Sequence, residues 1–159
     1  TDGRRVYSAI ANSNDRDNRF GTTGGLWSAM DAGTGQVLWT TTDPIQVTQL
    51  ATDPASGFQF PLQRWGHDFG AVTIANGVLF AGSTGVAPIP SLGVPGYPGG
   101  FFALDAATGR ILWQFASDGA GNSGPSVVDG MVYWGSGYSH LGNAFGLSGT
   151  PKLVAFSLK

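Results

Sequence analysis

The residues best suited to chemistry lie in one short segment, Arg64-Trp65-Gly66-His67-Asp68. An indole can cover a flat ligand, an imidazole can move a proton near neutral pH, and a carboxylate can act as a base or a metal ligand. A similar glycine-containing segment later in the chain carries Asn122, whose amide can donate to a carbonyl. We therefore expect Asp68 and His67 to be catalytic, and Trp65 and Asn122 to bind a cofactor.

Each of these residues also has a structural interpretation, which the sequence leaves open. Trp65 can pack between layers of the fold, and His67 can be a structural or surface histidine. Asp68 can cap a turn through its carboxylate, and Asn122 can serve the backbone of its own loop.

Two further segments carry weaker signals. The segment 12–18 (Asn-Ser-Asn-Asp-Arg-Asp-Asn) places oxygen ligands at alternate positions, as a calcium loop does. It lacks the glycine and the distant glutamate of such a loop, so a polar loop is favoured and no metal site is predicted. Tyr138-Ser139-His140 falls in a variable loop that faces either a channel or solvent. The sequence has neither a Gly-x-Ser-x-Gly elbow nor a phosphate loop.

An internal repeat indicates which elements hold these residues. Two segments share the pattern Ala-x-Asp-x-x-Thr-Gly-x-x-x-Trp, in which the aspartate caps a tight turn, the glycine takes a positive φ and the tryptophan lies on the following strand. The shared positions after the alanine are Asp31, Thr34, Gly35 and Trp39 in the first copy, and Asp105, Thr108, Gly109 and Trp113 in the second. A third copy begins at 152–158.

A second repeat consists of an Asx-Gly pair followed by an apolar strand. It occurs at Asp2-Gly3, Asn76-Gly77 and Asp129-Gly130, and this pair is a strong hairpin signal. The two repeats together predict an all-β fold, a β-propeller of four-stranded antiparallel blades with almost no helix.

The blades are expected at approximately 1–45, 66–118 and 119–159, with the first and last incomplete. Their inner strands are expected near 70–75 and 124–128. Two insertions interrupt the repeat: an irregular stretch at 40–64, and a proline-rich loop at 84–100. We expect Trp39 and Trp113 to be largely buried, each against an adjacent blade.

Composition fits this fold and excludes several functions. Glycine accounts for 26 of 159 residues, aromatic residues for 12% and charged residues for 11%, which suits short strands and many turns. The net charge is −2 without a basic stripe, so no nucleic-acid partner is expected. No apolar run is long enough for a membrane span, and the absence of cysteine excludes disulfides and thiolate metal sites.

The Asp-x-x-Thr-Gly-x-x-x-Trp pattern resembles the tryptophan-docking motif of the pyrroloquinoline-quinone (PQQ)-type β-propellers, in which the tryptophan packs between adjacent blades. The resemblance covers nearly the whole chain. Residues 122–138 and 152–158 look like the C-terminal part of polyvinyl-alcohol-dehydrogenase-like quinoproteins, and 24–31 and 38–44 fit the same proteins. The resemblance implies about three blades from an eight-bladed ring, whose upstream blades lie on the same or another chain.

The resemblance also implies a function. Such proteins bind PQQ and calcium, oxidise secondary alcohols such as polyvinyl alcohol, and pass electrons to a cytochrome c in the periplasm or outside the cell. Without cysteine, this chain cannot supply the pair of adjacent cysteines that some of these enzymes stack on the cofactor. The alternative is a non-catalytic, quinoprotein-like propeller that acts as a protein-interaction scaffold, because one fold hosts many functions.

Overall fold

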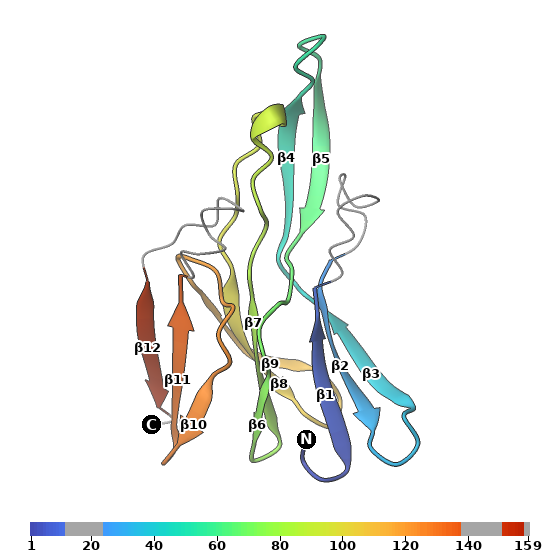
Figure 1. Ribbon diagram of the computed structural model, residues 1–159, viewed down its shortest axis with the longest axis vertical. Helices are drawn as coiled ribbons and strands as arrows, with labels where there is room; N and C mark the ends of the chain where they lie inside the picture. Colours follow the sequence, from blue (N-terminus) through green and yellow to red (C-terminus); the bar gives the residue numbers. More distant parts are fainter. Residues whose placement is uncertain (12–23, 138–150, 158–159) are drawn as a thin grey trace.

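The computed structural model describes residues 1–11, 24–137 and 151–157 of the chain (Figure 1). These residues form antiparallel strands, and the one helical element among them is a short 3₁₀ turn, η1 (Pro90–Leu92). The all-β class predicted from the repeats is confirmed.

Three sheets stand side by side as successive blades (Figure 1). The first contains β1 (Arg5–Ile10), β2 (Leu26–Asp31) and β3 (Val37–Thr42). The second contains β6 (Thr73–Ala75), β7 (Val78–Ser83), β8 (Gly100–Asp105) and β9 (Ile111–Ala116). The third contains β10 (Ser126–Val128), β11 (Met131–Ser136) and β12 (Lys152–Ser157). The middle blade therefore has four strands, and its neighbours have three each within the described residues.

The inner strands β6 and β10 are shorter than expected. Residues 70–72 precede β6 and pass close to the next blade, since a Cβ built on Gly70 would lie 3.1 Å from the carbonyl oxygen of Asn122. Pro125 precedes β10 and has no N–H group to donate to a ladder. Its carbonyl instead accepts a 2.6 Å hydrogen bond from Thr73 of the middle blade.

The turns at one end of the sheets follow the predicted chemistry. Asn76 and Asp129 both have φ of 49°, and the glycines after them have φ of 76° and 75°. Positive φ at both central residues is the geometry of a type I′ hairpin turn. In the other repeat, Asp105 Oδ1 accepts hydrogen bonds from the N–H of Ala107 at 3.0 Å, and from the N–H and hydroxyl of Thr108 at 2.8 and 2.9 Å.

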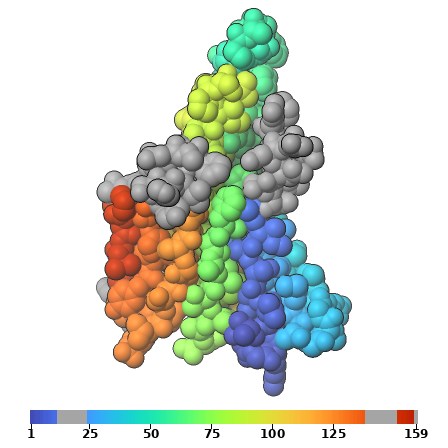
Figure 2. Space-filling view, in the orientation of Figure 1, coloured from blue at the N-terminus to red at the C-terminus, as the bar shows by residue number. Residues whose placement is uncertain are grey.

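The expectation of an irregular stretch at 40–64 is wrong. β4 (Gln46–Thr52) and β5 (Gln59–Trp65) form an antiparallel hairpin that rises above the blades (Figures 1 and 2). Its turn repeats the blade chemistry: Asp53 accepts from the N–H of Ala55 and the hydroxyl of Ser56, and Gly57 has φ of 72°. A small apolar core lies where the hairpin meets the loop between β7 and β8. Its members are Ala51, Phe60, Leu62, Ile89, Leu92 and Val94.

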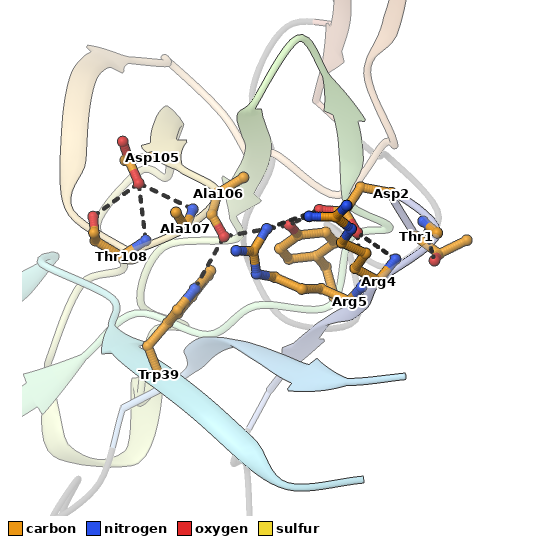
Figure 3. A network of polar contacts seen from close by, with 11 residues as sticks. Thr1, Asp2, Arg4, Arg5, Trp39, Asp105, Ala106, Ala107 and Thr108 are labelled. Carbon is orange, nitrogen blue, oxygen red and sulfur yellow. Dashed lines mark hydrogen bonds and ion pairs between the residues drawn. The ribbon is translucent and has the colours of Figure 1, made fainter. Parts of the chain in front are cut away.

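The main core lies at the junction between the first and second blades. Trp27 is fully buried there, and its ring packs 5.0 Å from that of Phe102. Trp39 is 9% exposed, and its Nε1 donates to the backbone carbonyl of Ala106 at 3.1 Å (Figure 3). The prediction that Trp39 is buried against an adjacent blade is confirmed.

The same prediction is wrong for Trp113, which is 39% exposed. Its indole packs edge-on against Phe156 of the third blade, with ring centroids 4.9 Å apart. Trp39 is covered by the turn residue Ala106, which directly follows Asp105. The corresponding position of the third blade directly follows Ser157 and lies outside the described residues.

Candidate functional site

The candidate residues lie at the end of the blades opposite the tight turns. After β5 the chain passes through an entry segment, residues 66–72, before it forms β6. Backbone hydrogen bonds fix the start of this segment. The carbonyl of Gly66 accepts from Gly25 at 2.8 Å, and the N–H of Gly66 donates to Ile45 at 2.8 Å. The entry segment is therefore tied to the residues just before β2 and just after β3, at one end of the first blade.

Asp68 points into the protein. The residue is 1% exposed, and neither of its carboxyl oxygens accepts a hydrogen bond from an N–H or hydroxyl of the described residues. Its neighbour is the carboxyl of Asp43, which is 2% exposed. Burial, followed by the like charge of Asp43, raises the pKa of Asp68 to about 9.

Asp43 was not among the residues selected from the sequence. Its carboxyl accepts hydrogen bonds from the hydroxyl of Ser83 and, at 2.8 Å, from the N–H of Ile45. Burial raises the pKa of Asp43, and these two donors oppose the shift. The available signal was its place directly after the Trp39 strand, but no local pattern showed that Asp43 meets Asp68.

His67 and Asn122 are joined through Thr84. The N–H of Thr84 donates to the carbonyl of His67 at 2.7 Å, and the Thr84 hydroxyl donates to Oδ1 of Asn122 at 2.6 Å. The His67 ring is partly buried, with Nδ1 3.1 Å from the carbonyl oxygen of Ala11. The structure thus links two of the predicted residues across two blades, and Thr84 is a connecting residue that the sequence did not single out.

Trp65 lies at the end of β5 and is half-buried. A Cβ built on Gly24 would lie 2.8 Å from Cβ of Trp65, so the side chain packs directly over the backbone before β2. The side chain of Asp68 packs in the same way over the next residue, Gly25, because a Cβ built on Gly25 would lie 2.6 Å from Oδ2 of Asp68. Trp65 and Asp68 therefore pack against two consecutive glycines, where a larger residue would clash.

A hollow of about 390 Å³ adjoins the entry segment of the third blade. Asn122 lines it, and because Oδ1 of Asn122 accepts from Thr84, its amide nitrogen is left to donate. Ser136 also lines it, with a buried hydroxyl that has no partner among the described residues. Phe69, 51% exposed, forms one wall. Trp65 and Asp68 do not line this hollow.

Two of the weaker candidate segments, 12–18 and Tyr138 to His140, lie outside the described residues. Within residues 1–11, 24–137 and 151–157, no group of three histidine or acidic side chains is placed to hold a metal ion. In the same residues, no helix is long and apolar enough to cross a membrane.

The successive antiparallel blades and their repeated turns define the chain as part of a β-propeller. Residues 22–149 match the model of a PQQ-repeat family described as "Outer membrane protein assembly factor BamB". The chain belongs to this family of PQQ-type propellers.

The chain also resembles individual proteins, each at less than 30% sequence identity. The chain is 29% identical over 182 aligned positions to a polyvinylalcohol dehydrogenase of Sphingopyxis sp. (strain 113P3), an alignment that covers 99% of this chain and 24% of that protein. The chain thus spans about a quarter of the length of this relative.

Among solved structures, the quinohemoprotein alcohol dehydrogenase ADHIIG of Pseudomonas putida HK5 has 19% identity and a TM-score of 0.48 over 74% of this chain and 19% of its own. BamB of Moraxella catarrhalis has 17% identity and a TM-score of 0.29 over 70% of this chain and 40% of its own.

Proposed function

We propose that these blades belong to a longer PQQ-dependent dehydrogenase that oxidises secondary alcohols, with polyvinyl alcohol as a representative substrate. The observation that carries the proposal is the alignment with a polyvinylalcohol dehydrogenase over 99% of this chain. The bound quinone supplies the oxidising power in such chemistry, and the protein supplies binding, orientation and proton transfer. By the same resemblance we propose an eight-bladed ring, a calcium ion, a cytochrome c as electron acceptor, and a periplasmic or extracellular location.

The described residues support distinct parts of this role. The amide of Asn122 is oriented by Thr84 and faces a hollow where it can donate to a ligand carbonyl. Trp65 is the proposed aromatic contact, at the partly exposed end of β5. His67 is the more accessible of the two proposed acid–base residues, and Asp68 lies behind it in the buried interior.

The test is an activity assay on the longer protein that contains these blades. It is reconstituted with PQQ and calcium and supplied with a secondary diol such as 2,4-pentanediol. Reduction of cytochrome c or an artificial dye should depend on PQQ. His67→Gln and Asp68→Asn should each lower the rate, by roughly 10²–10⁴-fold if the residue transfers the proton. Asp118→Asn is the matched control, because Asp118 is exposed and its ion-pair partner among the described residues is Lys152.

The second candidate is a non-catalytic scaffold, and the description of the matching family favours it. A scaffold needs no cofactor and no proton-transfer residues. A folded longer protein that reduces no acceptor with any alcohol in the presence of PQQ would therefore support this candidate and overturn the first.

A further inference from the structure

The two junctions between blades are built from the same backbone hydrogen bonds. Gly25 donates to Gly66 at 2.8 Å in the first junction, and Gly99 donates to Gly119 at 3.2 Å in the second. A second backbone hydrogen bond is also shared. The N–H of Asp43, four positions after Trp39, donates to Gly25 at 2.9 Å, and the N–H of Ser117, four positions after Trp113, donates to Gly99 at 3.2 Å. The junctions can therefore be compared residue by residue.

The side chains of the two junctions differ in charge. The residue four positions after the tryptophan is Asp43 in the first junction and Ser117 in the second. The entry segments place Asp68 in the first junction where the second has Gly121. The fold thus forms this junction without a carboxyl group at either of these two positions. Burying two carboxyls is costly, and the second junction shows that propeller packing does not require them.

The carboxyl pair is closed in by backbone. A Cβ on Gly66 would lie 2.1 Å from Oδ2 of Asp43, and one on Gly25 would lie 2.6 Å from Oδ2 of Asp68. Asp43 has its own donors in Ser83 and Ile45, whereas neither carboxyl oxygen of Asp68 has a hydrogen-bond partner among the described residues. The carboxyl of Asp43 is the charged neighbour of Asp68. Two carboxylates cannot both remain charged at close range away from water, and one shared proton removes the repulsion.

We propose that Asp43 and Asp68 form a proton-sharing pair, in which Asp68 carries one proton at neutral pH and donates a hydrogen bond through it to the Asp43 carboxylate. Asp43 is thereby a positioning residue for Asp68. Ser83 and Ile45 satisfy the oxygens of Asp43 and favour its ionised form, which leaves the proton on Asp68. Among the described residues, His67 also acts on the pair, because its charge interaction with Asp43 lowers the pKa of that carboxyl.

The existence of the pair does not depend on the proposed function, and its catalytic use does. Proton binding is therefore measured separately from activity. Unfolding of the longer protein is followed by calorimetry at pH 7 in buffers of different ionisation enthalpy, which gives the number of protons released. Because Asp68 ionises on unfolding, Asp68→Asn should release one proton fewer than the parent. Asp105→Asn is the control and should change nothing at pH 7, because the turn donors of Asp105 keep it ionised.

Infrared difference spectroscopy of the folded protein provides a second readout where a variant unfolds differently. The C=O stretch of a protonated carboxyl should be present at pH 7 and lost in Asp68→Asn. In Asp43→Asn the band should titrate at lower pH, because the like charge is gone and the new amide can donate to Asp68. If proton release is equal in the parent and Asp68→Asn, or if the parent shows no such band at pH 7, the pair does not share a proton.

The catalytic use of the pair has its own readout in the active enzyme. Asp43→Asn should shift the alkaline limb of the pH–rate profile, whereas a purely structural Asp43 would lower the rate equally at every pH. An inactive longer protein that still shows the proton release and the infrared band would overturn the proposed function and leave the pair intact.

Discussion

The indole N–H of Trp39 in the first blade donates to the carbonyl of Ala106 in the turn of the second blade, at 3.1 Å (Figure 3). The contact links the two copies of the repeat, because the strand tryptophan of one copy binds the turn of the next. The turn also accommodates the ring itself, since a Cβ on Gly109 would lie 2.5 Å from Cε3 of Trp39. The glycine of the repeat is thus needed for packing as well as for its φ of 75°.

Replacing Trp39 should be among the most destabilising single changes in the chain. Trp39→Ala empties a site that is 9% exposed and should cost roughly 3–5 kcal/mol in the free energy of unfolding. Trp39→Phe keeps most of the apolar area and should cost less. Trp113→Ala, at a site 39% exposed, should also cost less than Trp39→Ala. Urea unfolding of the longer protein measures all three, and equal costs for the two alanine variants would contradict the difference in packing.

Acid should destabilise the blades through their turns. Hydrogen bonds from Thr108 and Ala107 hold the pKa of Asp105 below its usual value, so the folded state favours the ionised form. The resulting stability is present above the unfolded pKa of about 3.8 and is lost as the pH falls through the folded pKa. Asp105→Asn should remove part of this acid sensitivity. Melting temperatures between pH 6 and pH 2 test this prediction, and an unchanged acid slope in the variant would exclude it.

The pair in the first junction should have the opposite pH dependence. The folded pKa of Asp68 is about 9 and its ordinary value is 3.8, so the folded state binds the additional proton between these values. Its contribution to stability is complete below pH 4 and declines as the pH rises towards 9. Denaturant unfolding at pH 6 and pH 9 should therefore show a larger alkaline loss in the parent than in Asp68→Asn. Equal losses would place the titration elsewhere.

The 159-residue chain by itself should not remain a monomer. The outer face of the third blade exposes Leu153 at 76%, Val128 at 51% and Tyr133 at 37%, and that of the first exposes Val6 at 43% and Ile10 at 45%. Apolar area in water costs roughly 25 cal/mol per Å², so these faces favour association. Sedimentation should show self-association, which Leu153→Lys weakens and Phe58→Lys, at the hairpin tip, does not. A soluble monomer with a cooperative melt would refute this prediction.

Local chemistry made much of the fold predictable. The turn at Asp105 depends on residues within four positions, so its sequence is sufficient to indicate its geometry. The hairpin turn at Asp53 uses the same chemistry, with serine in place of threonine. It was missed because the prolines in this stretch indicated an irregular segment. Exposure of Trp113 could not be predicted from its own strand, because burial depends on what covers it from the next blade.

The site was less predictable than the fold because its contacts are distant in sequence. Asp68 was selected for its own chemistry. Its partner Asp43 precedes the β4–β5 hairpin in the sequence, whereas Asp68 follows it, so the two residues meet only in the folded chain. Asn122 was selected as a free amide, and Thr84, which holds its oxygen, belongs to the preceding blade. No periodicity or spacing rule connects segments that meet only through the packing of blades.

If these blades belong to a quinoprotein, the longer protein binds PQQ, so cofactor binding is the most direct test. The purified longer protein is titrated with PQQ in the presence of calcium, and binding is followed by calorimetry. We expect saturable binding that weakens in Asn122→Ala and is unchanged in Asp118→Asn. A folded protein that shows no saturable binding of PQQ would contradict the proposed dehydrogenase function and leave the scaffold as the remaining candidate.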